Sequence, residues 1–205
     1  MPGEDVNRAM MGFWEEVYRS SPPWDIKRPQ PAIVQLVQSG DLKPGRTLDV
    51  GSGAGENAIF LAKSGFRVTG IDIVERAVEI AKSRAAKQRV EVEFRVGNAL
   101  ELHSYFSEGE FDNVIDSGLF HALTNEQRPV YVSQINWVLR NGGSYFMLCF
   151  SDKERKFSGP RRISKQEIEE TFSTVFKINY IHDTVFGDTL HRKGAQGYIT
   201  NASKL

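Results

Sequence analysis

The stretch Asp49-Val50-Gly51-Ser52-Gly53-Ala54-Gly55 places glycines at three alternate positions. The preceding run, residues 46–50, is strand-like, and residues 56–63 carry apolar side chains at helical spacing. Glycines between a strand and a helix let the backbone turn tightly and approach a ligand without interference from a Cβ atom. The stretch therefore predicts a ligand-binding loop that opens an α/β fold.

Strand-like and helix-like segments continue to alternate after this loop. Strands are expected at 66–73, 90–96, 111–116 and 144–150, helices at 74–87, 130–139 and 164–172, and a closing antiparallel pair at 175–186 and 195–200. The strict alternation in 90–96 is typical of a strand near a sheet edge. Repeated strand–helix–strand units indicate a mostly parallel sheet with helices on both faces and a ligand at the carboxyl ends of the strands.

The start of the helix at 130–139 stays open between two interpretations. Thr124-x-x-Gln127 is the pattern of a capping box, which would begin the helix before Pro129. Alternatively, a short turn comes first and Pro129 takes the first helical position.

The bulk composition sets limits on organisation and partners. We expect a single domain over 1–205, with a cap segment at 1–44 and a core at 45–205. The 26 Lys and Arg balance 26 Asp and Glu, so no general positive field gathers nucleic acid. The lone cysteine, Cys149, excludes an internal disulfide. Without a signal peptide or a long apolar run, the chain is expected in the cytoplasm and not in a membrane.

Two carboxylates narrow the choice of ligand for the glycine loop. Asp72 ends the strand after the loop, where an acid accepts both hydroxyls of a ribose. The G-x-G-x-G spacing departs from the dinucleotide pattern G-x-G-x-x-G, and Asp49 would repel a pyrophosphate but suit an ammonium group. S-adenosylmethionine carries an amino group, a sulfonium and a ribose but no phosphate. A short-chain reductase is disfavoured, because no tyrosine has lysine four residues later.

The motifs together resemble those of class I S-adenosylmethionine-dependent methyltransferases. Residues 48–57 (LDVGSGAGEN) resemble their motif I, 70–73 (GIDI) their second-strand motif, 97–99 (GNA) the segment flanking the adenine, and 139–143 (LRNGG) the turn before their fifth strand. The resemblance implies a Rossmann-like α/β fold with a seven-stranded, mostly parallel sheet, the last strand antiparallel, and an N-terminal helical cap. It also implies S-adenosyl-L-methionine as cofactor and S-adenosyl-L-homocysteine as product.

The resemblance assigns roles to individual residues. Asp72 would bind the ribose, Ile73 would lie against the adenine, and Asn98 with Ala99 would lie near the adenine amino group. Many relatives have Asp in place of Asn98, but an amide oxygen also accepts that hydrogen bond. The candidate cofactor-binding residues are Trp24, Asp49, Gly51, Gly53, Gly55, Asp72, Ile73, Asn98, Ala99 and Asp116. A metal is not favoured, although Asp116 and Asp152 stand roughly where metal-dependent catechol-type enzymes carry acids.

Aromatic residues gather before the core, in 13–18 (FWEEVY) and 22–25 (PPWD). The two prolines make the backbone around Trp24 extended, and an aromatic lid there would exclude water and offer a cation–π surface to a sulfonium. With 117–121 (SGLFH), this opening resembles thiopurine and tellurite-resistance type methyltransferases and bacterial quinone and heterocycle methyltransferases. That narrower resemblance implies a small acceptor (a thiol, a phenol or hydroquinone, or a heterocyclic nitrogen) bound under the cap.

His121 follows the fourth strand and is the candidate catalytic residue, as a base or as an orienting group. Positioning and desolvation supply most of the rate of an in-line methyl transfer, so a base is optional. The alternative is a histidine that only hydrogen-bonds its own loop. Phe157 and residues 159–162 (GPRR) form a loop able to cover the pocket, and Arg161 and Arg162 either hold an anionic acceptor or are solvated.

Two functions are carried forward from the sequence. The first is a small-molecule methyltransferase, and the second is a non-catalytic S-adenosylmethionine-binding protein of the same fold. The oligomeric state stays open between a monomer and a weak dimer.

Overall fold

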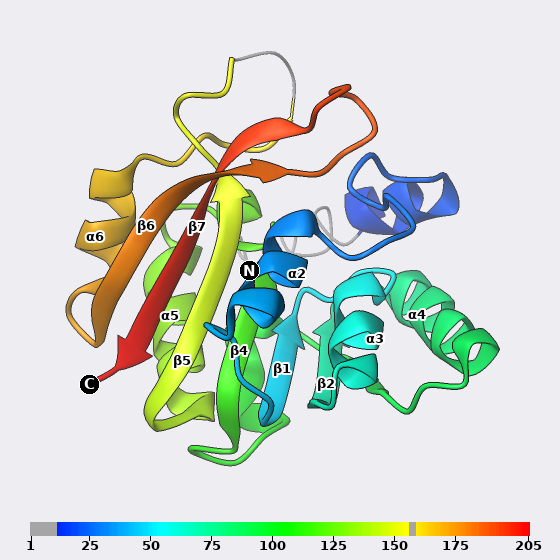
Figure 1. Cartoon of the computed structure of the whole chain (residues 1–205), viewed down its shortest axis with the longest axis horizontal. Helices are drawn as coiled ribbons and strands as arrows, with labels where there is room; N and C mark the ends of the chain where they lie inside the picture. The colour runs from blue at the N-terminus through cyan, green and yellow to red at the C-terminus, as the bar shows by residue number, and fades with distance from the viewer. Residues whose placement is uncertain (1–11, 156–158) are drawn as a thin grey trace.

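Seven strands form one sheet in the order β3-β2-β1-β4-β5-β7-β6 (Figure 1). The computed structural model describes residues 12–155 and 159–205. The first five strands run parallel, and β7 is antiparallel to both β5 and β6. The strands are β1 Arg46–Val50, β2 Arg67–Asp72, β3 Glu93–Val96, β4 Phe111–Ser117, β5 Leu139–Phe150, β6 Phe176–Phe186 and β7 Ala195–Lys204. The predicted fold, with its last strand antiparallel, is confirmed.

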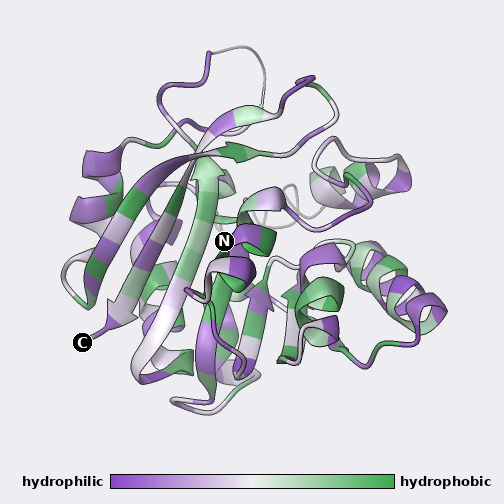
Figure 2. Cartoon of the chain, viewed as in Figure 1, coloured by the Kyte–Doolittle hydropathy of each residue, from purple (hydrophilic) through white to green (hydrophobic). Residues whose placement is uncertain are grey.

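Helices cover both faces of this sheet. They are α2 Pro31–Ser39, α3 Glu56–Lys63, α4 Glu75–Gln88, α5 Gln127–Val138 and α6 Lys165–Phe172, with short 3-10 helices at η1 Ala99–Ser104 and η2 Phe120–Ala122. One apolar cluster joins the sheet to η1, α5 and α6, and a second joins it to α2, α3 and α4. Figure 2 shows hydrophilic and hydrophobic residues alternating along the edge strand β6, as expected where one face meets solvent.

The capping-box interpretation of the start of α5 is confirmed, and the alternative with Pro129 at the first helical position is wrong. Thr124 and Gln127 form the reciprocal capping-box hydrogen bonds, at 3.0 and 3.3 Å. The helix begins at Gln127, so Pro129 is its third residue instead of its first. Proline is tolerated there because the amide groups of the first helical turn have no intrahelical acceptor.

The strand β5 begins earlier than its apolar residues indicate. It was expected at 144–150, with a turn at 141–143, but it starts at Leu139. The glycine-containing segment lies inside the strand as an irregularity, where the register with β4 shifts between Phe111 and Asn113. Because pairing with β4 continues on both sides of this irregularity, the expected turn is absorbed into the sheet.

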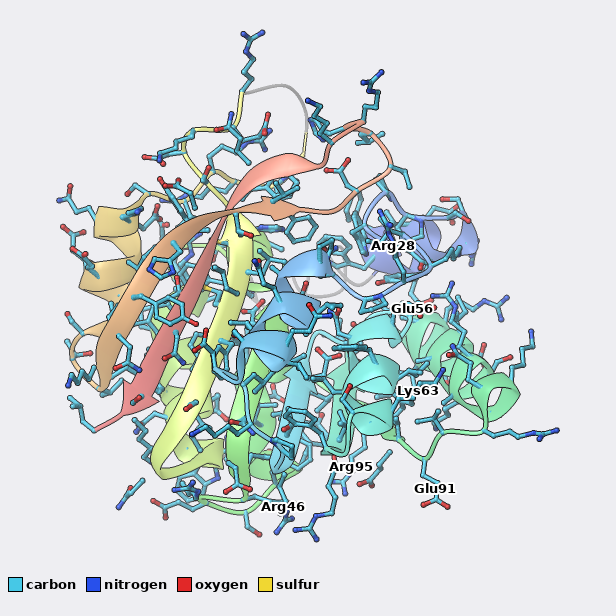
Figure 3. All side chains as sticks on the ribbon, viewed as in Figure 1. Arg28, Arg46, Glu56, Lys63, Glu91 and Arg95 are labelled. Carbon is cyan, nitrogen blue, oxygen red and sulfur yellow. The ribbon has the colours of Figure 1, made fainter. Side chains whose placement is uncertain are left out.

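The direction of the strand order reverses between β1 and β4. In open parallel sheets, ligands bind in the crevice at the carboxyl ends of the two strands on either side of such a point. The loops that follow these two strands touch, since a Cβ atom on Gly51 would lie 3.0 Å from the Cβ atom of Leu119. Figure 3 labels Glu56 toward this end of the sheet and Arg46 at the opposite end.

The N-terminal residues lie over the same end of the sheet. Residues 12–19 are helical, and the following segment leads to α2. In Figure 1 this blue segment lies above α3 and α4, beside the orange loop between β6 and β7. Among the helices formed by the described residues, none has both the length and the apolar character needed to cross a membrane.

Candidate active site

Backbone hydrogen bonds to β2 hold the glycine loop between β1 and α3. The amide groups of Gly51 and Ser52 donate to the carbonyl oxygen of Ile71, at 2.8 and 3.0 Å. Gly53 has a φ of +52°, a conformation that side-chain-bearing residues rarely adopt, and a Cβ atom there would lie 2.6 Å from the Tyr18 hydroxyl oxygen. The backbone of Gly53 therefore packs closely against Tyr18 of the N-terminal segment.

Asp72 ties the end of β2 to that loop. One carboxylate oxygen accepts from the amide of Gly53 at 2.7 Å and the other from the amide of Val74 at 2.9 Å. A carboxylate oxygen has two acceptor positions, so each retains one for a ligand hydroxyl. The half-buried Ile73 follows, on the surface packed against Tyr18 and Val74. The residues expected at the ribose and at the adenine are therefore adjacent to the glycine loop.

Asn98 and Ala99 lie beside Asp72. The Gly97 amide donates to the Asp72 carbonyl oxygen at 2.9 Å, which holds the two half-buried residues at the end of β2. The Asn98 side-chain oxygen accepts from the amide of Leu100 at 2.9 Å and caps η1. This local bond fixes the direction of the amide group that was expected near an adenine.

Asp49 is a buried carboxylate without a counter-charge. It is 1% exposed, and its Oδ2 atom has no hydrogen-bond partner among the described residues. Burial, together with the negative charges of Asp72 and Asp116, raises its pKa to about 8. Because a buried charge is unfavourable unless it is paired, this position is suited to a cationic ligand group.

Asp116, at the end of β4, is surrounded by the protein's own donors. It accepts from the amides of Leu119 and Phe120 and from the hydroxyls of Tyr131 and Tyr145, the last two at 2.6 and 3.1 Å. Burial raises its pKa to about 6, and these hydrogen bonds oppose the rise. With no exposed surface, Asp116 positions the loop after β4, so the arrangement favours that role over the cofactor contact expected from the sequence.

His121 lies in that loop as a neutral, buried imidazole. Its Nδ1 atom accepts from the amide of Phe150 at 3.0 Å, so the neutral ring carries its proton on Nε2. Burial lowers its pKa to about 3, with further contributions from the charges of Arg162 and Arg128. This geometry leaves Nε2–H as the donor of the ring, 3.4 Å from the Cβ position of Gly118 in the same loop.

Three aromatic rings meet at the carboxyl ends of β4, β5 and β6. The His121 ring centroid lies 4.9 Å from that of Phe150 and 5.5 Å from that of Phe186, and the two phenylalanine rings are 4.9 Å apart. Gly118 brings the chain close to this group, because a Cβ atom there would lie 3.0 Å from Phe186. The three rings form a buried group beside the loop after β4, hereafter the aromatic wall.

Trp24 joins the N-terminal segment to the site. Its indole nitrogen donates to the Tyr18 hydroxyl at 3.1 Å, and it packs on both the α3 side and the Val74 side of the core. Tyr18 was not among the predicted site residues, although it lies within the aromatic segment noted in the sequence. Its position over Gly53 depends on a contact between segments 35 residues apart, for which no local pattern exists.

The N-terminal segment, residues 12–30, is hereafter the cap. Arg84 on α4 donates to both carboxylate oxygens of Asp25, at 2.8 and 2.7 Å, and to Glu56 at 3.0 Å. The Gln30 side chain exchanges two hydrogen bonds with the backbone of Gly187, at 2.9 and 2.8 Å. The cap is therefore anchored to α3, to α4 and to the loop between β6 and β7.

Other parts of the described surface lack these features. A shallow depression of about 560 Å³ is lined by Arg67, Lys82, Glu91 and their neighbours at the amino ends of β2 and β3, opposite the glycine loop. Among residues 12–155 and 159–205, no three His, Cys, Asp or Glu side chains gather as a metal site. Asp152 instead accepts from the Tyr198 hydroxyl at 2.7 Å. Phe157 lies outside the described residues.

Comparison with known proteins agrees with this geometry. Residues 47–143 match the family model described as a methyltransferase domain. The chain is 32% identical over 190 residues to a 2-heptyl-1-hydroxyquinolin-4(1H)-one methyltransferase of Mycobacteroides abscessus, covering 89% of this chain and 82% of the relative.

Two solved structures share the fold. A structure from work on the conversion of a disulfide bond into a thioacetal group during echinomycin biosynthesis superimposes with a TM-score of 0.85 at 26% identity, over 95% of this chain and 93% of that one. The 1,6-didemethyltoxoflavin-N1-methyltransferase of Burkholderia thailandensis, solved with S-adenosylhomocysteine, gives 0.79 at 19% identity, over 98% and 89%. The chain therefore belongs to the family of S-adenosylmethionine-dependent small-molecule methyltransferases.

Proposed function

We propose that this enzyme methylates a heteroatom on a flat aromatic molecule that binds under the cap. The observation that carries the proposal is the aromatic wall of His121, Phe150 and Phe186 beside the loop after β4. Planar rings pack favourably on such a wall, by about 0.5–1.5 kcal/mol per ring pair beyond the area buried. The Mycobacteroides abscessus relative, named for a hydroxyquinolinone substrate, also supports a flat acceptor.

The donor side of the proposal rests on Asp49, Asp72 and the glycine loop. S-adenosylmethionine supplies the methyl group and leaves as S-adenosylhomocysteine. We assign Asp72 to the ribose hydroxyls, Ile73, Asn98 and Ala99 to the adenine, and Asp49 to the positive charge of the donor. The assignment of Asp49 fits its Oδ2 atom, which has no partner among the described residues.

The cap would exclude water and help to orient the donor. Trp24 and Tyr18 lie above the loop, and their mutual hydrogen bond fixes the two rings relative to each other. A closed, dry site strengthens the interactions that align an acceptor with the methyl group. We therefore assign Trp24 and Tyr18 to the upper wall of the donor site.

His121 would orient the acceptor through its Nε2–H group. In the overall step a sulfur–carbon bond of the donor breaks and a bond from the acceptor heteroatom to the methyl carbon forms. A protonated acceptor also loses its proton to water. Because the Nδ1 atom already accepts a hydrogen bond from Phe150, no base is assigned in the described part of the site.

A methyl-transfer screen tests this function. The purified chain is incubated with S-adenosylmethionine and with matched flat and aliphatic acceptors: hydroxyquinolinones, thiophenol, phenols and heterocyclic amines against alkyl thiols and alkyl amines. The proposal predicts turnover of flat acceptors, and a loss of about tenfold in kcat/KM in Phe186→Ala. Binding of the donor without turnover of any acceptor would instead support the non-catalytic alternative.

A further inference from the structure

Three arginines lie near the aromatic wall, and two of them share a single carboxylate. Arg128 on α5 and Arg161 both donate to Glu167 on α6. Arg162 donates to two backbone carbonyl oxygens, those of Pro160 and Arg155. Arg128 and Arg161 therefore share one glutamate, and Arg162 pairs with no carboxylate among the described residues, which leaves the group with an excess of positive charge.

Arg128 is the buried member of this group. Its side chain is 4% exposed, and its guanidinium carbon lies 4.5 Å from the centroid of the Phe120 ring. Only Nη1 donates to Glu167, whereas Nε and Nη2 have no partner among the described residues. Those two atoms form one edge of the planar guanidinium group, and that edge matches the two oxygens of a carboxylate.

Further donors without partners lie nearby on the same end of β5. The Arg162 Nε atom and the Ser151 Oγ atom are also buried and have no partner among the described residues. The Arg162 guanidinium carbon lies 5.1 Å from the centroid of the Phe150 ring, which packs on His121. Arg162 therefore adjoins the wall to which the acceptor is assigned, and Arg128 packs on Phe120, the residue before His121 in that wall.

An anion would resolve the unfavourable electrostatics of this group. Buried donors without acceptors destabilise a fold, and more so when they are charged. The charges of Arg162 and Arg128 also act on the His121 ring, whose lowered pKa keeps it neutral beside them. A neutral acceptor would leave this excess positive charge uncompensated.

We infer that Arg128 and Arg162 form a carboxylate-binding subsite, so that the acceptor is a flat aromatic molecule bearing a carboxylate or a similar planar oxyanion. This inference rests on the proposed function, because it places the anion on the acceptor. S-adenosylmethionine also carries a carboxylate, and binding of that group at Arg128 is the competing source. If the acceptor supplies the carboxylate, replacing Arg128 weakens binding of the acceptor. If S-adenosylmethionine supplies it, the replacement weakens binding of the donor.

Binding to the enzyme saturated with S-adenosylhomocysteine tests the inference. The probes are 2-hydroxybenzoate and its neutral analogue 2-hydroxybenzamide, measured by calorimetry. The inference predicts that the wild type binds the carboxylate at least about tenfold more tightly than the amide, which corresponds to about 1.4 kcal/mol. In Arg128→Met the ratio of the two affinities falls to about one. In Arg128→Lys the ratio is intermediate, because lysine keeps the charge but lacks the planar pair of donors.

Controls separate the possible failures. Arg76→Met removes an exposed arginine on α4 and should leave the preference unchanged. If Arg128→Met does not fold, Arg162→Met gives the same test from the other side of the subsite. The inference would be overturned if the wild type showed no preference for the carboxylate, or if the preference survived in Arg128→Met. It would also be overturned if Arg128→Met lost only affinity for S-adenosylhomocysteine. Failure of the wild type to bind S-adenosylhomocysteine at all would contradict the proposed function instead.

Discussion

The Tyr18 hydroxyl oxygen lies where a side chain on Gly53 would have to go, 2.6 Å from the position of its Cβ atom. Gly53 also donates its amide to Asp72 at 2.7 Å. One glycine therefore contacts the cap above it and the carboxylate assigned to the ribose below it. We therefore expect the position of the cap and the shape of the proposed donor site to be coupled through this residue.

Replacing Gly53 with alanine should weaken donor binding. The new methyl group would displace Tyr18, and we expect the affinity for S-adenosylmethionine to fall at least about tenfold. Gly40→Ala is the matched control, because Gly40 also has a positive φ, of +78°, but nothing lies within 4 Å of its Cβ position. That variant should lose about 1 kcal/mol of stability and keep its donor affinity. Equal donor affinities in both variants would contradict the coupling.

The hydrogen bond between Trp24 and Tyr18 should be measurable as a coupling energy. Tyr18→Phe, Trp24→Phe and the double variant form a cycle for donor binding. We expect a coupling of about 0.5–1.5 kcal/mol, the usual contribution of one hydrogen bond. Strict additivity of the two single losses would show that the bond does not contribute to the donor site.

The ion pair between Arg84 and Asp25 should hold the cap closed. The carboxylate of Asp25 is 5% exposed and that pairing lowers its pKa against the effect of burial. We expect Arg84→Met to destabilise the fold by about 2 kcal/mol and to raise KM for the donor. Because the folded-state pKa of Asp25 is lowered, its contribution is present above the unfolded pKa and is lost as the pH falls.

Arg76→Met is the control for that experiment, since Arg76 makes an exposed pair with Glu79 and should change stability by less than about 0.5 kcal/mol. Thermal unfolding between pH 7 and pH 3 measures both variants. If the stabilities of the wild type and Arg84→Met differ by the same amount at pH 7 and at pH 3, the result argues against the pairing.

His121 should not appear in the pH–rate profile. With a pKa of about 3 it stays neutral across the assay range, so kcat/KM should show no inflection near 6.5. An orienting group serves every acceptor alike, and we expect His121→Ala to slow a phenol and an aryl thiol by similar factors, of about tenfold. A much larger loss for the phenol would restore the role of a base.

Much of the fold and the donor side followed from local patterns. The glycine loop and Asp72 are recognisable because strand, turn and helix signals lie within about 25 residues of sequence. The closing antiparallel pair also followed from the residues, and the resemblance to known motifs supported S-adenosylmethionine as the cofactor. The start of β5 was missed, because an irregular strand through Gly142 and Gly143 is stabilised by pairing with β4 and not by its own residues.

The rest of the site depends on contacts between distant segments. Gln30 bonds to Gly187, and Arg84 bonds to Asp25, across 157 and 59 residues of chain. Such polar pairs leave no periodic trace in either segment. The burial of Arg128 was equally hidden, since an arginine in the first turn of an amphipathic helix is ordinarily exposed.

Asp49, which we assign to the positive charge of the donor, should also make the stability of the fold depend on pH. Its pKa of about 8 means that the carboxyl group is mostly protonated at pH 7 in the donor-free protein. A folded-state pKa raised above the unfolded value stabilises the fold at low pH, and the contribution is lost as the pH rises through 8. We therefore expect Asp49→Asn to unfold at a higher temperature than the wild type at pH 9, by about 3 °C or more.

The most direct test is calorimetric titration of S-adenosylmethionine at pH 7 in two buffers with different heats of ionisation. A cationic donor favours the ionised carboxylate, so binding to the wild type should release about one proton. Asp49→Asn should release none and bind about 10- to 100-fold more weakly, whereas Glu91→Gln, at an exposed position, should match the wild type. Binding without proton release, or unchanged affinity in Asp49→Asn, would contradict the assignment of the donor's positive charge to Asp49.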